Sequence, residues 1–163
     1  CDPFLSPAAK AELNEAVSVT ASFDEVYAAF CARGLGECEH LALVPFVTPM
    51  PRYMAAADLV ICRAGAATIS EVCASGTPCI MVPSPNVTNN HQEKNARALA
   101  DQGGAIMIRE SECTAQGLMK EISALLGDKK RYEQMRHALQ DMVVLDSAER
   151  LCNIIVELGK AGK

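Results

Sequence analysis

The sequence lacks several features that mark common protein classes. It has no tryptophan, and aromatic residues make up only 4% of its 163 residues, too few for a surface that stacks single-stranded nucleic acid. Its net charge of −5 and its scattered basic residues argue against nucleic acid as a partner. No apolar run approaches the ~20 residues that a membrane-spanning helix needs. Half of the residues are apolar, so the sequence predicts a globular domain with a sizeable core.

Cysteine is abundant, but its spacing fits neither a disulfide framework nor a metal site. The eight cysteines include no CxxC pair, and the three histidines are not spaced as metal ligands beside them. Cys62 and Cys79 fall within apolar strand candidates, and Cys73 and Cys152 fall on apolar helix faces. We therefore expect buried, reduced thiols in a reducing compartment.

Short apolar runs alternate with helical patterns from His40 onward. This alternation predicts an α/β fold, a Rossmann-like parallel sheet flanked by helices, with further helices at the C-terminus. The predicted strands are Leu41–Phe46, Leu59–Cys62, Cys79–Val82 and Ala105–Ile108. The predicted helices are Pro51–Ala57, Ile69–Ser75, His91–Gln102, Ala115–Leu126, Lys129–Met142 and Ser147–Leu158. Three capping pairs are predicted at helix starts, namely Ser22 with Glu25, Thr68 with Glu71 and Asn90 with Glu93.

The first forty residues are less regular. They predict helices at Ala8–Val17 and Phe23–Arg33, with a short strand at Val17–Thr20 between them. A doubly wound domain normally opens on a buried strand, but Cys1–Pro7 contains two prolines and is a poor core strand. We therefore expect residues 1–40 to be an irregular or incomplete part of the domain, and residues 41–163 to form the ligand-binding part.

The segment Asp58–Glu71 carries the strongest functional pattern. An apolar strand leads into a glycine-containing turn, and a helix begins at once, so free backbone N–H groups and the positive end of a helix dipole converge where a phosphate can bind. Gly65 allows close backbone approach, while Thr68 adds a hydroxyl and Arg63 adds a charge. The alternative is an ordinary tight strand–helix connection, because neither a Walker loop nor a GxGxxG fingerprint is present.

Glu71 has two interpretations. It can be the carboxylate of a capping box with Thr68, which contributes on the order of 1 kcal/mol. It can instead accept hydrogen bonds from the two hydroxyls of a ribose, because an ionised acceptor suits a diol.

A polar loop leaves the next strand at Pro83–Asn90 and leads into a helix. Amides and an imidazole gather there, at Asn89, Asn90, His91, Gln92 and Asn95. The carboxyl ends of parallel strands are where open α/β sheets bind ligands, and amides can read sugar hydroxyls because they both donate and accept. The alternative is an ordinary polar loop in which Asn90 caps the helix.

These segments together closely resemble the C-terminal, donor-binding half of the MurG family, peptidoglycan N-acetylglucosaminyltransferases that convert lipid I to lipid II. The matching segments are Tyr53–Asp58 (YMAAAD), Leu59–Glu71 (LVICRAGAATISE), Gly76–Pro83 (GTPCIMVP), His91–Leu99 (HQEKNARAL) and Asp146–Leu158 (DSAERLCNIIVEL). The resemblance covers about three-quarters of the chain. The combination is specific to the family, whereas no single segment is.

The resemblance implies a GT-B glycosyltransferase domain that binds UDP-N-acetylglucosamine or UDP with no cofactor and no essential metal. By position, the backbone of Val47 meets the uracil, Glu71 holds the ribose, and the turn after the first matching strand faces the diphosphate. The implied binding residues are Val47, Met50, Arg63, Gly65, Ala66, Ala67, Thr68, Glu71, His91, Gln92 and Asn95. In the implied reaction an acceptor hydroxyl attacks the anomeric carbon with inversion and UDP leaves.

The chain also departs from the family pattern. The family's acceptor-binding half, which supplies the proposed base and the membrane-facing surface, has no counterpart here, so we expect no catalytic residue in this chain and no activity without that half. The resemblance implies a cytoplasmic protein, peripheral to the inner face of the plasma membrane, that meets its lipid-linked acceptor through the missing domain. The family's glycine-rich opening turn has no clear counterpart, although Ala11–Val17 resembles the helix that follows it.

Two other functions remain open from the sequence. One is the donor-binding subunit of a split N-acetylglucosaminyltransferase that needs a membrane partner. The other is a domain like that of the UDP-N-acetylglucosamine 2-epimerases, which share the GT-B architecture. A dehydrogenase-type Rossmann domain is disfavoured because the dinucleotide fingerprint is missing.

Overall fold

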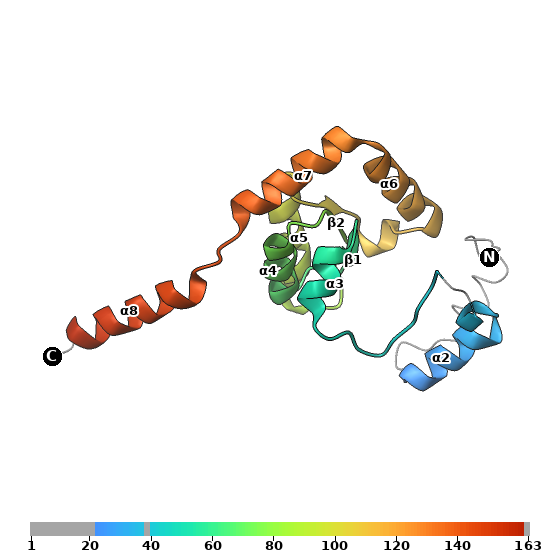
Figure 1. Cartoon of the computed structure of the whole chain (residues 1–163), viewed down its shortest axis with the longest axis horizontal. Helices are drawn as coiled ribbons and strands as arrows, with labels where there is room; N and C mark the ends of the chain where they lie inside the picture. Colours follow the sequence, from blue (N-terminus) through green and yellow to red (C-terminus); the bar gives the residue numbers. More distant parts are fainter. Residues whose placement is uncertain (1–21, 38–39, 162–163) are drawn as a thin grey trace. The chain divides into compact units, whose positions relative to one another are not determined.

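A computed structural model describes residues 22–37 and 40–161 of the chain, which divides into two compact units (Figure 1). The first unit ends at Thr48 and the second begins at Pro49. The helix predicted over Ala8–Val17 and the strand predicted over Val17–Thr20 lie outside the described residues. The domain boundary expected after residue 40 stays a prediction.

The first unit contains α2 (Phe23–Ala32) and the short 3₁₀ helix η1 (Leu35–Glu37). The predicted capping box at the start of α2 is confirmed, because Ser22 Oγ accepts from the Glu25 backbone N–H and the Glu25 carboxylate accepts from the Ser22 N–H at 2.7 Å. The strand predicted over Leu41–Phe46 is wrong. Those residues form no strand, and Phe46 is 81% exposed. The reason is Pro45, which has no N–H to donate to a neighbouring strand.

The second unit is built on a three-stranded parallel sheet in the order β1 (Val60–Cys62), β2 (Cys79–Met81) and β3 (Ile106–Met107). Each strand falls within a predicted one, so these three predictions and the α/β fold class are confirmed. The central strand β2 is fully buried, because it has a neighbour on each side and helices over the sheet. A continuous apolar run is what such a position requires.

The helices of this unit agree with the predicted ones in number and order. They are α3 (Met50–Ala56), α4 (Ala66–Ser75), α5 (His91–Asp101), α6 (Ala115–Gly127), α7 (Lys129–Met142) and α8 (Ser147–Ala161). Two 3₁₀ turns, η2 (Thr88–Asn90) and η3 (Glu110–Glu112), lie in the loops after β2 and β3. Only α4 differs clearly from its prediction, because it begins at Ala66 rather than Ile69.

The core lies between the sheet and helices α4, α5, α6 and α7. Its fully or nearly fully buried members include Val72 of α4, Leu99 of α5, Leu125 of α6 and Leu139 of α7. Gly104, just before β3, lets these helices approach the sheet, since a methyl group there would lie 2.5 Å from Met142 Cε and 3.3 Å from Leu139 and Leu99. A hydrogen bond from Tyr132 of α7 to the Asp58 carbonyl oxygen, 2.9 Å long, fixes α7 beside the start of β1.

The described cysteines are all free thiols. Cys73 and Cys79 are buried as predicted, and burial raises the pKa of the half-buried Cys62 to about 11, so it stays protonated at neutral pH. The pKa of Cys79 is also raised by burial, with smaller contributions from Cys62 and Cys73. The prediction for Cys152 is wrong, because this residue is exposed on α8. Residues 144–160 are all exposed, so this helix buries no face within the described chain.

None of the helices in the described ranges combines the length and the apolar character that a membrane span requires.

Candidate functional site

The turn between β1 and α4 lies at the carboxyl edge of the sheet. Gly65 is the residue before the first turn of α4, with φ −69° and ψ 150°, and no side chain caps this helix. The first helical hydrogen bond runs from the Ile69 N–H to the Gly65 carbonyl oxygen at 3.0 Å. The N–H groups of residues 66–68 therefore have no helical partner, and within the described chain nothing else accepts from them. They form an open N-terminal turn of the kind that binds anions.

The start of α4 also corrects the predicted cap. Thr68 lies in the first turn of the helix, so it does not form a capping box with Glu71. The alanines at 66 and 67 are strong helix formers, and they extend the helix to Gly65, which takes the capping position instead. A methyl group on Gly65 would meet only Thr68 Oγ1, at 3.6 Å. The protein itself thus leaves space beside this turn.

Glu71 follows in the second turn of α4, and its side chain is half-buried. Its carboxylate has no hydrogen-bond or ion-pair partner among the described residues, so no structural role within this part of the chain accounts for it. An unoccupied carboxylate one turn beyond an open helix N-terminus is what the ribose interpretation requires.

Arg63, directly after β1, joins the loops that follow all three strands. Its Nη1 donates to the Val82 carbonyl oxygen at 3.1 Å and also pairs with the Glu110 carboxylate. Both side chains of this pair are about half exposed. The other guanidinium N–H groups remain available, because arginine has five donors. Contact between Arg63 and a phosphate stays a prediction.

The polar residues of α5 tie the carboxyl edge together. Gln92 Oε1 accepts from the Ser84 N–H at 3.0 Å, and Asn95 Nδ2 donates to the Ala64 carbonyl oxygen at 3.2 Å. His91 Nδ1 lies 3.0 Å from the Thr88 carbonyl oxygen. The Asn95 contact brings the start of α5 against the β1–α4 turn, so two of the predicted site segments do meet. The polar atoms left over, such as Gln92 Nε2, are the ones that a ligand can use.

The turn before α5 has an unusual backbone. Asn89 and Asn90 have φ values of 56° and 51°, and no other non-glycine residue in the described ranges has a positive φ. Asn90 does not cap α5 as predicted. Its side chain instead donates to Glu93 Oε2 at 2.7 Å.

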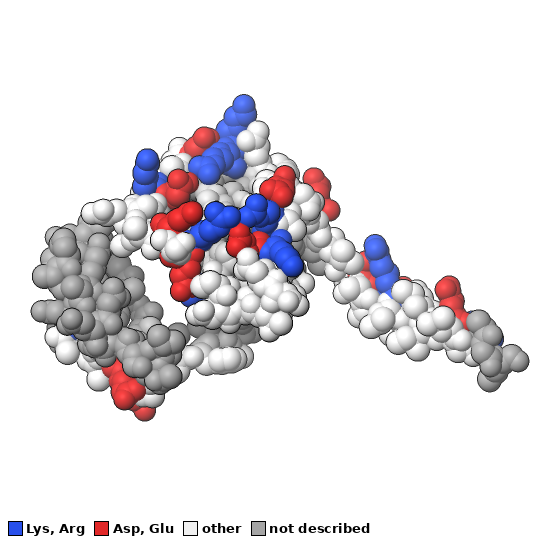
Figure 2. All heavy atoms as spheres, turned by 180° about the vertical axis from the view of Figure 1, so that it is seen from behind, with Lys and Arg blue, Asp and Glu red and all other residues white. Residues whose placement is uncertain are grey.

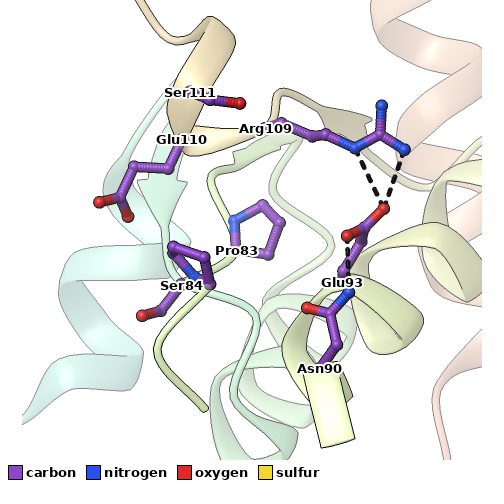
Figure 3. Close-up of a pocket in the computed structure, with 8 residues that line it drawn as sticks. Pro83, Ser84, Asn90, Glu93, Arg109, Glu110 and Ser111 are labelled. Carbon is purple, nitrogen blue, oxygen red and sulfur yellow. Dashed lines mark hydrogen bonds and ion pairs between the residues drawn. The ribbon is translucent and has the colours of Figure 1, made fainter.

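Sequence reasoning missed the residues that follow β3. A cavity of about 100 Å³ lies between the loop at 83–85, the first turn of α5 and the segment Arg109–Ser111 (Figure 3). None of the binding residues that the resemblance implies lines it, although Asn90 and residues 83–85 of the predicted polar loop do. Arg109 contacts Glu93 there through Nε at 3.1 Å and Nη2 at 3.0 Å. The sequence could have indicated these residues by their position, because Arg109 and Glu110 come shortly after β3 just as Arg63 comes after β1.

The remaining predicted residues are Val47 and Met50. Val47 lies in the first unit, and the contact predicted between its backbone and a uracil stays a prediction. Met50 is the first residue of α3 in the second unit and is 39% exposed. On the face of the protein shown in Figure 2, basic and acidic side chains of the second unit are interspersed. This mixture agrees with the ion pairs that Arg97 and Arg109 make with Glu93.

Curated relatives share the sequence at about 40% identity. A UDP-N-acetylglucosamine–N-acetylmuramyl-(pentapeptide) pyrophosphoryl-undecaprenol N-acetylglucosamine transferase of Bacillus licheniformis is 42% identical over 83% of this chain and 37% of its own length. The enzyme of the same name from Acetivibrio thermocellus is 43% identical over 74% of this chain and 33% of its own. The chain therefore spans about a third of the length of these relatives.

A solved structure shares the fold. The crystal structure of Acinetobacter baumannii MurG matches with a TM-score of 0.66 and 26% identity, over 78% of this chain and 39% of that one. The profile of the glycosyltransferase family 28 C-terminal domain matches residues 10–151. Because this family profile covers most of the chain and the solved structure shares its fold, this chain belongs to the glycosyltransferase family 28 C-terminal domain family.

Proposed function

We propose that this chain binds UDP-N-acetylglucosamine and is the donor half of a transferase that moves N-acetylglucosamine to a lipid-linked acceptor. The observation that carries the proposal is the α4 start, where three N–H groups and the following Glu71 carboxylate have no partner among residues 22–37 and 40–161. The N–H groups suit the diphosphate and the carboxylate suits the ribose diol. The names of the relatives supply the identity of the donor.

The transfer step needs groups from outside this chain. An acceptor hydroxyl attacks the anomeric carbon with inversion, the bond from that carbon to the UDP oxygen breaks, and the hydroxyl proton passes to a base of the acceptor-binding part. The residues of this chain bind and orient the donor, and the dipole of α4 stabilises the negative charge that develops on UDP. We propose that donor binding needs no metal, so EDTA should leave the affinity for UDP unchanged.

The acceptor side of the proposal concerns location and partners. The acceptor-binding part would bring the donor half to the cytoplasmic face of the membrane, whether it belongs to the same polypeptide or to a separate subunit. Adding a separately produced acceptor-binding domain and the lipid-linked acceptor to this chain tests both arrangements, because transfer of labelled N-acetylglucosamine requires that the two halves assemble. No transfer with a fully folded acceptor half would argue against the proposal.

Glu71→Gln tests the binding site itself. Because Glu71 neither caps α4 nor pairs with another described residue, the variant should unfold at nearly the wild-type temperature. The loss of a charged hydrogen-bond acceptor should lower UDP affinity by about tenfold or more, or about 1.4 kcal/mol. Isothermal titration with UDP, UDP-N-acetylglucosamine and NAD measures this, and we expect no binding of NAD.

Glu133→Gln is the matched control. Glu133 lies on α7 and lines a surface hollow with Asp58, which precedes β1 at the opposite edge of the sheet. The Glu133→Gln variant should therefore bind UDP with the wild-type affinity. Equal UDP affinity of the Glu71 and Glu133 variants would reject the ribose role.

A further inference from the structure

We infer that Glu93 is a positioning residue for the sugar end of the donor: it holds the left-handed turn at Asn89–Asn90 and the loop after β3 together, and so aims His91 and Gln92. The inference rests on the proposed function and adds to it. It makes Glu93 necessary for the sugar contacts of His91 and Gln92, but not for the nucleotide contacts of the Gly65 turn and Glu71.

The turn itself needs support from outside. Asn89 and Asn90 are consecutive residues in the left-handed region, which asparagine adopts more readily than other non-glycine residues when its side chain has a local hydrogen bond. Asn90 cannot supply that support as a helix cap, since its side chain makes no capping hydrogen bond. Its amide donates to Glu93 Oε2 at 2.7 Å instead. The Glu93 carboxylate is therefore the group that holds the Asn90 side chain, beside the backbone hydrogen bond from the Asn90 N–H to the Val87 carbonyl oxygen within the turn.

The second oxygen of Glu93 is held by two arginines. Oε1 accepts from Arg97 Nη2 at 2.7 Å, and Arg109 donates to it through both Nε and Nη2. In Figure 3 the Asn90 amide and the Arg109 guanidinium approach the carboxylate from different sides, while Glu110 points away from it. Arg109 comes from the loop after β3, so a single carboxylate links that loop to the turn that follows β2.

The turn that Glu93 holds directly precedes the residues predicted to contact the sugar. His91 and Gln92 follow Asn90 in the chain, and Gln92 in turn holds the loop after β2 through the Ser84 N–H. No hydrogen bond or ion pair in the described chain joins Glu93 directly to the Gly65 turn or to Glu71, and the Arg63–Glu110 pair and the Asn95–Ala64 hydrogen bond do not involve Glu93. A change at Glu93 should therefore disturb the sugar contacts and leave the diphosphate and ribose contacts intact.

The separation of sugar contacts from nucleotide contacts can be tested by comparing two ligands. Titrations of the full chain with UDP and with UDP-N-acetylglucosamine yield the affinity gained from the sugar, for the wild type and for Glu93→Gln. We expect the variant to keep its UDP affinity within twofold and to lose tenfold or more for UDP-N-acetylglucosamine. Arg109→Gln, which removes the link from the other side, should show the same pattern, and it carries the test if the Glu93 variant does not fold.

Two further variants separate positioning from general damage. Glu112→Gln is the matched control, because Glu112 pairs with Arg109 at 3.6 Å and makes no hydrogen bond to Asn90; it should bind both ligands as the wild type does. Adding Asn90→Gly to Glu93→Gln should restore most of the lost affinity for UDP-N-acetylglucosamine, because glycine adopts a positive φ without support.

The outcomes are distinguishable from those of the proposed function. If the wild type binds no UDP, the proposed function fails. If it binds UDP and the sugar adds no affinity, if Glu93→Gln keeps the wild-type preference for UDP-N-acetylglucosamine, or if Asn90→Gly restores nothing, the inference about Glu93 is overturned while nucleotide binding stands.

Discussion

A methyl group on Gly65 is the smallest change that separates binding from folding in this protein. The backbone at Gly65 has a negative φ that alanine also adopts, and the new methyl would meet only Thr68 Oγ1 at 3.6 Å. The cost to stability is therefore limited to the poorer capping preference of alanine, about 0.5–1 kcal/mol, which lowers the melting temperature by a few degrees. The same methyl would stand beside the open N–H groups that begin α4.

The effect on binding should be much larger. If the methyl displaces one phosphate oxygen from its N–H partner, the lost charged hydrogen bond is worth about 1.5–3 kcal/mol, or about 10- to 100-fold in affinity for UDP. Titration calorimetry with UDP and a thermal melt of the same sample measure both quantities. Gly127→Ala is the control, because a methyl on this last residue of α6 meets nothing within 4 Å. Wild-type UDP affinity in a folded Gly65→Ala variant would refute close backbone approach at this turn.

Three further predictions concern stability. Gly104→Ala should lower the free energy of unfolding in urea by about 1–3 kcal/mol through overpacking, and Met142→Ala should cost less in that background than alone, because Met142 Cε is the nearest clashing atom. Hydrogen bonds from Asn90, Arg97 and Arg109 lower the pKa of Glu93 from 4.5 to about 2. The stabilisation by this carboxylate should therefore be present above pH 4.5 and lost as the pH falls toward 2. In urea titrations over that pH range, the free energy of unfolding of Glu93→Gln should fall less than that of the wild type. Tyr132→Phe should cost about 1 kcal/mol in urea unfolding, and no loss would show that the hydrogen bond to the Asp58 carbonyl oxygen adds nothing.

The fold could be predicted from the sequence where apolar pattern alone decides the structure. The runs at 59–62, 79–82 and 105–108 all became strands because a buried parallel strand needs little beyond continuous apolar residues. The run at 41–46 had the same composition, but one proline outweighed it. The predicted burial of Cys152 was wrong for another reason. A stripe of apolar residues on a helix indicates which face is apolar, and tertiary structure decides whether that face is buried.

The geometry of the candidate site was predictable at the Gly65 turn, whereas the contacts among its polar side chains were not. The turn at Gly65 followed from the strand–glycine–helix order, and a Glu71 carboxylate with no partner in the described part of the chain agrees with the ribose interpretation. The pairing of Arg63 with Glu110, and of Glu93 with Arg109, could not be predicted because these residues are 47 and 16 positions apart in the chain and meet only through the strand order. Helix α4 also began earlier than expected, since two alanines favour helix more strongly than Thr68 favours a cap.

The exposure of α8 has an energetic consequence for the whole C-terminal segment. A helix of 15 residues that rests on no other element of the described chain has its own backbone hydrogen bonds and an exposed ion pair between Arg150 and Asp146 to offset the entropy of ordering, and helices of that length are marginal in water. The backbone amides of α8 should exchange with solvent far faster than those of α7, because α8 can unfold without exposing any core residue. A surface that covered Leu151, Ile154 and Leu158 would gain the burial of these side chains and would make the helix persistent in the same step.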